Sequence, residues 1–300
     1  MSDGNSLINL GDVSKPAVVL IEKISDAIGG LFKPYHIRQI ARAEADADKI
    51  KAIAQIEITE LQQRALQRFV FEEAKKQNNI EAITAKALPY LNEDANPNDV
   101  EDDWITNFFD KSRLISDEHM QELWAKLLAG EANSPGSYSK RTIDLLSSLD
   151  KADALLFSTL CRFCFFLEED ISPLIYSQDY LIYTNSGINF STLNHLDDIG
   201  LISFNFMSGY ALSELPKHIN AIYHTILLSI EFPEVQDNHL DTGKVILTKA
   251  GQELARICVS EPISDFLDYV LGMWRDKGLV ISSPYPQNLS IKQEHQAEVV

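Results

Sequence analysis

Two cysteines at CxxC spacing are the residues whose types and positions most suggest chemistry. Cys161 and Cys164 stand in the sequence CRFC, and such a pair is half of many zinc sites and the centre of many redox sites. The chain has one further cysteine, Cys258, and no second CxxC pair. The pair lies in the apolar run LLFSTLCRFCFFLEE, where an uncharged thiol packs like a small hydrophobic side chain. The sequence therefore favours core packing over metal or redox chemistry for these cysteines.

Histidines and short catalytic motifs add no second candidate site. The histidines are scattered, and the six-residue separation of His218 and His224 is not typical of metal ligands. His195 could act in chemistry, although an isolated histidine more often makes a polar structural contact. The chain has no glycine-rich phosphate loop, GxSxG, HExxH or paired-carboxylate pattern. We therefore expect a protein that is not an enzyme and that has no cofactor and no metal.

Charge and hydropathy restrict the partners of the chain. Its 300 residues carry a formal net charge of −18, which repels the phosphate backbone of nucleic acids. Hydrophobic residues make up 45% of the chain, enough to bury a core. We find neither an apolar run of about 18 residues, as a membrane helix needs, nor the pattern of a signal peptide. Together with the odd cysteine count, this predicts a cytoplasmic protein, free or peripheral to the inner membrane.

The element around which the chain would be organised is a long helix predicted over residues 33–77. After Pro34 this stretch has no proline or glycine, and alanine is dense over residues 41–54. An apolar stripe of this length needs a partner to cover it, although it is not a strict heptad repeat. The sequence predicts a homo-oligomer assembled through this helix; the alternative is a broken helix pair folded into one core. The predicted self-association residues are Ile37, Ile40, Ile50, Ile53, Ile58, Leu61 and Phe69.

A shorter amphipathic helix is predicted just before the long one, in KPAVVLIEKISDAIGGLF. Pro16 suits the first turn of a helix, and Gly29 and Gly30 would end or hinge it. One alternative is a helix docked on the body of the protein. The other is a face that contacts a membrane surface or a protein partner, although its polar side is not rich in lysine or arginine. The apolar face consists of Leu20, Ile21, Ile24, Ile28 and Leu31.

The C-terminal half has the order of elements that is typical of a winged helix. A helix over residues 191–198 runs into a strand after Gly200, and HTILLSIEF is a candidate for the second strand of the wing. A further strand ends at Leu247, and Thr248 would cap the helix that follows. The candidate recognition helix, FSTLNHLDDIG, has two acids and no lysine or arginine, whereas DNA recognition needs basic phosphate contacts. We therefore expect this domain to bind protein rather than DNA.

The predicted fold is mainly α with an α+β C-terminal part: a long N-terminal helix, a helical middle domain and a winged-helix-like C-terminal domain. The boundary between the all-α and α+β parts is expected between residues 150 and 175. The segments are a mobile N-terminus with the short amphipathic helix (1–32), a long helical arm (33–91), a helical domain (100–170), the winged-helix-like domain (171–282) and a disordered tail (283–300).

Two stretches resemble a bacterial family catalogued as domain of unknown function 2806. They are RALQRFVFEEAKKQNNIEAITAKALPYL and the longer stretch that runs from WITNFFDKSRLISDEHMQELWAKLLAG to SSLDKADALLF. The shared pattern is an aromatic and leucine-rich helix from Glu122 to Leu128, a short turn, and a leucine-rich helix ending at residues 150–153. Abortive-infection alpha-type proteins have a similar helix–turn–helix pattern. These resemblances cover roughly residues 60–165 and imply a role in anti-phage defence or stress response, without supplying a catalytic residue.

The functional hypothesis from sequence is an interaction or effector protein that self-assembles through residues 33–77 and binds an unidentified protein partner. Two alternatives remain open. In the first, the protein is an abortive-infection effector that makes peripheral membrane contact through residues 16–32. In the second, it is a winged-helix DNA-binding regulator.

Overall fold

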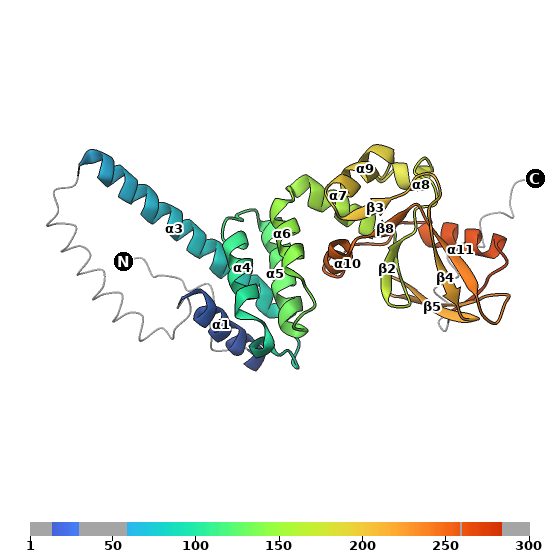
Figure 1. The fold of residues 1–300 in the computed structure, drawn as a ribbon, viewed down its shortest axis with the longest axis horizontal. Coiled ribbons are helices and arrows are strands. Elements are labelled where there is room, and N and C mark those ends of the chain that lie inside the picture. Colours follow the sequence, from blue (N-terminus) through green and yellow to red (C-terminus); the bar gives the residue numbers. More distant parts are fainter. Residues whose placement is uncertain (1–13, 30–58, 259, 284–300) are drawn as a thin grey trace, which may run out of the picture. The chain divides into compact units, whose positions relative to one another are not determined.

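The computed structural model describes residues 14–29, 59–258 and 260–283, which belong to two compact units (Figure 1). Unit 1 comprises Met1–Ser148 and unit 2 comprises Leu149–Val300. Unit 1 is helical in its described part, whereas unit 2 combines helices with antiparallel strands. The predicted helical N-terminal and middle parts are thus confirmed, as is a β-containing C-terminal part.

Five helices form the described part of unit 1. Aromatic side chains from α4 and α5 form the centre of its core: Phe108 stacks on Trp104 and meets the ring of Trp124 edge to face. Asp117 starts α5 by accepting hydrogen bonds from the backbone of His119 and Met120. The elements are α1 (Lys15–Ile28), α3 (Glu60–Ala87), α4 (Asp102–Ser112), α5 (Glu118–Asn133) and α6 (Lys140–Ser148), with the 3-10 turns η2 (Leu88–Tyr90) and η3 (Pro97–Asp99).

Helix α3 differs from the predicted helix at both of its ends. Thr59 is extended and caps the helix in a reciprocal pair with Gln62, so the predicted continuous helix over 33–77 is interrupted there; residues 33–58 lie outside the described part. At the other end, the helix continues through Asn79, which the sequence predicted to terminate it. The Asn79 side chain instead donates hydrogen bonds to the Arg113 carbonyl and to Ser116, so it does not compete with the helix backbone.

Unit 2 contains five helices and nine strands in its described residues. The helices are α7 (Lys151–Cys161), α8 (Leu181–Thr184), α9 (Phe190–Asp198), α10 (Lys249–Ala255) and α11 (Phe266–Asp276). The strands are β1 (Cys164–Leu167), β2 (Asp170–Pro173), β3 (Ile202–Phe204), β4 (Tyr210–Leu215), β5 (His218–Tyr223), β6 (Ile226–Glu231), β7 (Asn238–Gly243), β8 (Val245–Leu247) and β9 (Val280–Ser282).

The strands of unit 2 form one five-stranded antiparallel sheet and two separate pairs. The sheet has the order β2-β1-β5-β6-β9, and the pairs are β3-β8 and β4-β7. Buried rings from β1, β5 and α11 pack together in the core of the unit, where Phe165 stacks on Tyr223 and meets Trp274 edge to face. Phe266, the first residue of α11, is fully buried among the same rings.

The observed strand pairs differ from those predicted for the wing. Strand β3 pairs with β8, in the register Ile202 to Leu247, and Thr248 caps α10 as predicted. The segment HTILLSIEF forms β6, which pairs with β5 and β9 in the large sheet, so its assignment to the wing is wrong. Residues 205–244 separate β3 from β8 and contribute four strands to other pairings. These pairings cannot be predicted from the local sequence pattern.

Candidate functional site

The first half of α3 is the most unusual surface in unit 1. Every residue from 60 to 75 is exposed, and this part of α3 extends beyond α4 and α5 (Figure 1). Phe69 is 60% exposed and Leu61 is 69% exposed, so both predicted association residues in the described part lie on the surface. The predicted residues Ile37, Ile40, Ile50, Ile53 and Ile58 lie outside the described part.

Three further exposed apolar residues on the same half-helix were missed from sequence. Leu66, Val70 and Phe71 are each exposed, with Phe71 71% exposed. Leu66, Phe69 and Val70 are three and four positions apart, and therefore share one side of the helix. The available signal was this i, i+3, i+4 spacing, and the single apolar stripe predicted along the 33–77 helix did not include Leu66, Val70 or Phe71.

The second half of α3 anchors the exposed half to the body of unit 1. Ile80, Ile83 and Ala87 are buried, and α3 packs on α5 and α4. Lys86 adds a hydrogen bond of 2.9 Å from its Nζ to Gln121 Oε1. The exposed turns are thus held at one end by a packed helix, which fixes their direction relative to unit 1.

A groove of about 350 Å³ lies where α3 leaves the body. It is lined by charged and polar residues of α3 and by the residues that follow α4. Leu114 at its rim is 65% exposed and adds apolar surface next to the exposed half-helix. The lining residues are Glu72, Lys75, Lys76, Asn79, Arg113 and Leu114.

The apolar face of α1 is part of the core of unit 1. Leu20, Ile21 and Ile24 are at most 3% exposed, because α1 packs against α4 and η3. Lys23 Nζ also lies 2.6 Å from Asp102 Oδ1. The structure therefore shows the docked-helix alternative. The face predicted to be free for a membrane or a protein partner is buried instead. Ile28 is only partly buried, and Leu31 lies outside the described residues.

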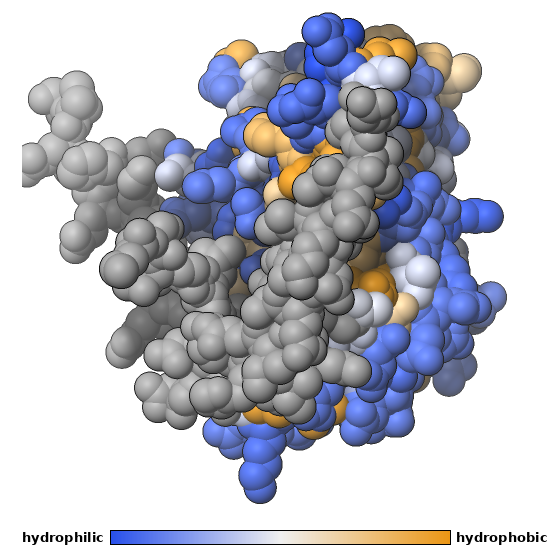
Figure 2. All heavy atoms as spheres, turned by 90° about the vertical axis from the view of Figure 1, so that its left-hand side faces the viewer, coloured by the Kyte–Doolittle hydropathy of each residue, from blue (hydrophilic) through white to orange (hydrophobic). Residues whose placement is uncertain are grey.

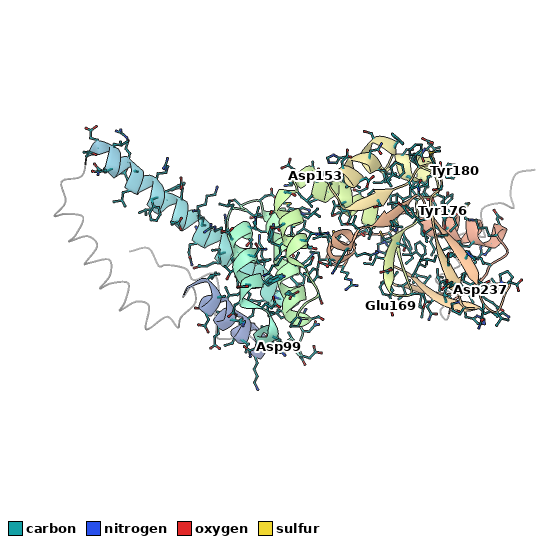
Figure 3. The ribbon with its side chains drawn as sticks, in the orientation of Figure 1. Asp99, Asp153, Glu169, Tyr176, Tyr180 and Asp237 are labelled. Atoms are coloured by element: carbon teal, nitrogen blue, oxygen red, sulfur yellow. The ribbon has the colours of Figure 1, made fainter. Side chains whose placement is uncertain are left out.

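A larger cleft, of about 550 Å³, is lined by residues that include Asp99, which Figure 3 labels. The buried carboxylate of Glu131 lies in its lining, but it accepts hydrogen bonds from the backbone of Gly136 and Tyr138, at 2.7 and 2.9 Å. Trp104 Nε1 donates to the Tyr138 carbonyl at 2.7 Å. These contacts hold the turn between α5 and α6 in place, which accounts for the polar groups without a catalytic role.

His195 makes the polar contact that an isolated histidine was expected to make. Its Nε2 lies 2.6 Å from Oδ1 of Asp153, which comes from α7 (Figure 3). The hydrogen bond with His195 lowers the pKa of Asp153, and the backbone N–H of Asp150 lowers it further, against the effect of burial. The pair therefore links α7 to α9 through a hydrogen bond.

The three cysteines are free thiols. Cys161 is buried, as the core-packing prediction requires, and its pKa is raised well above the ordinary value, first by its hydrogen bond with Cys164 and also by burial. Within residues 14–29, 59–258 and 260–283, no three histidine, cysteine or acidic side chains are grouped so that they could hold a metal ion.

The surface and the helix lengths bear on membrane contact. Hydrophilic residues dominate the face shown in Figure 2, and hydrophobic ones form small patches among them. Among the helices that the structure describes, none has both the length and the apolar character needed to cross a bilayer.

Comparison with known proteins identifies one family. The family model described as "Protein of unknown function (DUF2806)" matches residues 63–271, which extends the resemblance found in residues 60–165 through most of unit 2. No curated protein and no solved structure matches the chain significantly. The similarity to abortive-infection proteins therefore has no support from these comparisons.

Proposed function

The chain belongs to the DUF2806 family, and from its geometry we propose that it is a non-enzymatic interaction protein that assembles as a homo-oligomer through the exposed half of α3. The observation that carries this proposal is that residues 60–75 are all exposed, although they include several large apolar side chains. These are Leu61, Leu66, Phe69, Val70 and Phe71.

The physical reason is that a helix with no packing partner has little stability in water. Isolated helices shorter than about 12–15 residues are marginal in water, and most helices are stabilised by packing an apolar face. Burying one leucine or phenylalanine side chain contributes about 1.5–3 kcal/mol. Covering Leu66 and Phe69 would therefore stabilise both the helix and the complex that covers it.

The spacing of the apolar residues favours a second copy of the chain as the partner. If two α3 helices pair antiparallel, centred on the level of residue 68, through the side that carries Leu66 and Phe69, then Leu66 of one copy faces Val70 of the other. An antiparallel pair related by a two-fold axis makes each such contact twice. The pairs Arg64–Glu60 and Arg68–Glu72, at 3.8 and 3.4 Å within one chain, lie on the opposite side of the helix.

Light scattering of the full chain tests the proposal. We expect a molar mass of a dimer or larger at micromolar concentration, and a monomer when Leu66 and Phe69 are both replaced by Asp. The control replaces Arg64 and Arg68, exposed on the opposite side of α3, by Asp, and should keep the oligomer. A monomeric wild-type chain would contradict the proposal.

Unit 2 is proposed as the part that binds another protein through its winged-helix-like segment. The support is the sequence of α9, the β3–β8 pair and α10, together with the acidic residues Asp197 and Asp198 on α9. A DNA-binding regulator is the alternative class. It predicts a gel shift of duplex DNA that weakens steeply with salt, whereas the proposed role predicts no shift even at low salt.

The biological setting is a proposal as well. A cytoplasmic location and a role in anti-phage defence or stress response are predicted only from the sequence. The measurement is survival of phage-infected bacteria with and without the gene, and equal survival would argue against the defence role.

A further inference from the structure

Three cysteines lie near the C-terminal end of α7, although they come from separate segments of unit 2. Cys161 ends α7 and is buried, Cys164 begins β1 three residues later, and Cys258 follows α10. Cys258 Sγ lies 3.8 Å from Oγ of Ser158, which is three residues before Cys161 and shares one side of α7 with it. We propose that these residues form an oxidisable thiol site, in which Cys161 forms a disulfide with either Cys164 or Cys258.

Contacts outside the thiols hold the Cys258 segment against α7. Ser158 Oγ, one turn before the end of α7, donates to Cys258 Sγ at 3.8 Å. Arg162 Nε donates to the carbonyl oxygen of Glu261 at 3.0 Å. Because the segment is held at both Cys258 and Glu261, the position of Cys258 next to Cys161 is part of the fold.

A further set of contacts holds the same connector from the side of the large sheet. The Tyr223 hydroxyl donates to the Arg162 carbonyl at 3.0 Å and accepts from the backbone N–H of Ile263 at 3.0 Å. Cys164 is fixed in turn by its thiol, which donates to the Leu160 carbonyl at 3.8 Å. The sulfur atoms of Cys164 and Cys258 are thus positioned by hydrogen-bonded neighbours.

The environment of Cys161 suits a stored disulfide better than a catalytic thiol. The C-terminal end of a helix carries partial negative charge, which disfavours a thiolate, and reactive redox cysteines instead occupy positions that stabilise the thiolate. A disulfide is a strong oxidant when the protein stabilises its reduced form. The C-terminal end of α7 does not stabilise the thiolate of Cys161. Cys164 and Cys258 are partly exposed, and an oxidant reaches them first.

Hydrogen peroxide supplies a balanced route to the bond. Peroxide transfers an oxygen atom to the thiol of Cys164 or Cys258, which becomes a sulfenic acid with loss of one water. The Cys161 sulfur then attacks the sulfenic sulfur, its proton leaves with the hydroxyl group as a second water, and the S–S bond forms. Two thiols together lose two electrons, and one peroxide is reduced to two waters.

The two possible bonds exclude each other, because both use Cys161. One thiol therefore stays reduced in each chain after oxidation. A bond to Cys258 would join α7 covalently to the connector between α10 and α11, and that connector leads into the buried Phe266. Oxidation would thereby restrict the motion of this connector.

Thiol counting after peroxide treatment tests the site. The folded full-length protein is treated with hydrogen peroxide, quenched, denatured and alkylated with iodoacetamide, and its intact mass and peptides are measured. We expect the number of free thiols in the monomer to fall from the initial three to one, and dithiothreitol to reverse the loss.

Single substitutions separate this site from general oxidation. Cys164→Ser and Cys258→Ser should each form a disulfide between their two remaining cysteines, detected as disulfide-linked peptides, whereas Cys161→Ser and Cys161→Ala should form none. Circular dichroism of each reduced variant checks the fold. Retention of all thiols in the wild-type protein, or an equal yield of disulfide-linked peptides in the Cys161 variants, would overturn the proposal.

Discussion

Asp153 joins two kinds of structural contact in one side chain. Its Oδ2 accepts from the backbone N–H of Asp150 at 3.0 Å, which completes the capping box of α7, and its Oδ1 meets His195. Because these partners favour the carboxylate, the pKa of Asp153 is lower in the folded protein than in the unfolded chain. Its contribution to stability is therefore complete above the ordinary value of about 3.9 and is lost as the pH falls through the lowered folded value.

Replacing Asp153 by Asn tests this dependence on pH. At pH 7 we expect the free energy of unfolding to fall by about 1 kcal/mol, the usual scale for a helix cap, because the hydrogen bond with the exposed His195 adds little. The difference between wild type and variant should shrink as the pH is lowered below about 4. Urea unfolding across this range measures it. Asp198→Asn, at an exposed position of α9, is the control, and a constant difference at all pH values would contradict the assignment.

Gly251 in α10 is required by a close backbone approach. A Cβ atom at this position would lie 2.0 Å from the carbonyl oxygen of Leu201, which is main chain and cannot rotate away. We expect Gly251→Ala to destabilise the protein by about 1–3 kcal/mol. The matched variant is Gly272→Ala in α11, where a Cβ would meet no atom within 4 Å, and where the better helix propensity of alanine should stabilise by up to about 1 kcal/mol. Thermal unfolding compares the two, and equal effects would refute the steric explanation.

Local signals in the sequence located several elements, and distant contacts account for the misses. The cap at Thr248 could be predicted because capping depends on neighbouring residues. The end of α3 was misplaced because Asn79 is bonded to residues 34 and 37 positions away. Strand β6 was placed in the wrong pair because its register with β5 and β9 depends on the whole sheet. The thiol site was not predicted from the sequence for the same reason, since Cys258 is far from Cys161 along the chain.

The proposed antiparallel pairing of α3 makes a prediction about its apolar side. Val70→Asp would place a charge opposite Leu66 of the other copy at two symmetric positions, and we expect it to weaken dimerisation several-fold. Arg64→Asp, on the opposite side of the helix, should leave the affinity unchanged. Sedimentation equilibrium measures the dissociation constants.

Circular dichroism of both variants checks that the helix is retained. Equal weakening by Val70→Asp and Arg64→Asp would contradict the proposed register.

At the scale of the whole molecule, the match to the family model includes residues of both units. It begins in α3 and continues into α11, so it includes both the exposed half-helix and the mixed unit 2. Assembly through α3 would give each particle two or more copies of unit 2. Linked copies of a binding module raise the apparent affinity for a multivalent partner without new contacts.

Hydrogen–deuterium exchange of residues 60–75 at several protein concentrations tests the central claim most directly. A half-helix that is exposed on every side exchanges quickly when alone and slowly when a second copy covers it. We predict that protection of this segment rises with concentration in the wild-type chain and does not rise in the Leu66→Asp/Phe69→Asp variant. Fast exchange at every concentration, or protection that does not depend on concentration, would contradict assembly through α3.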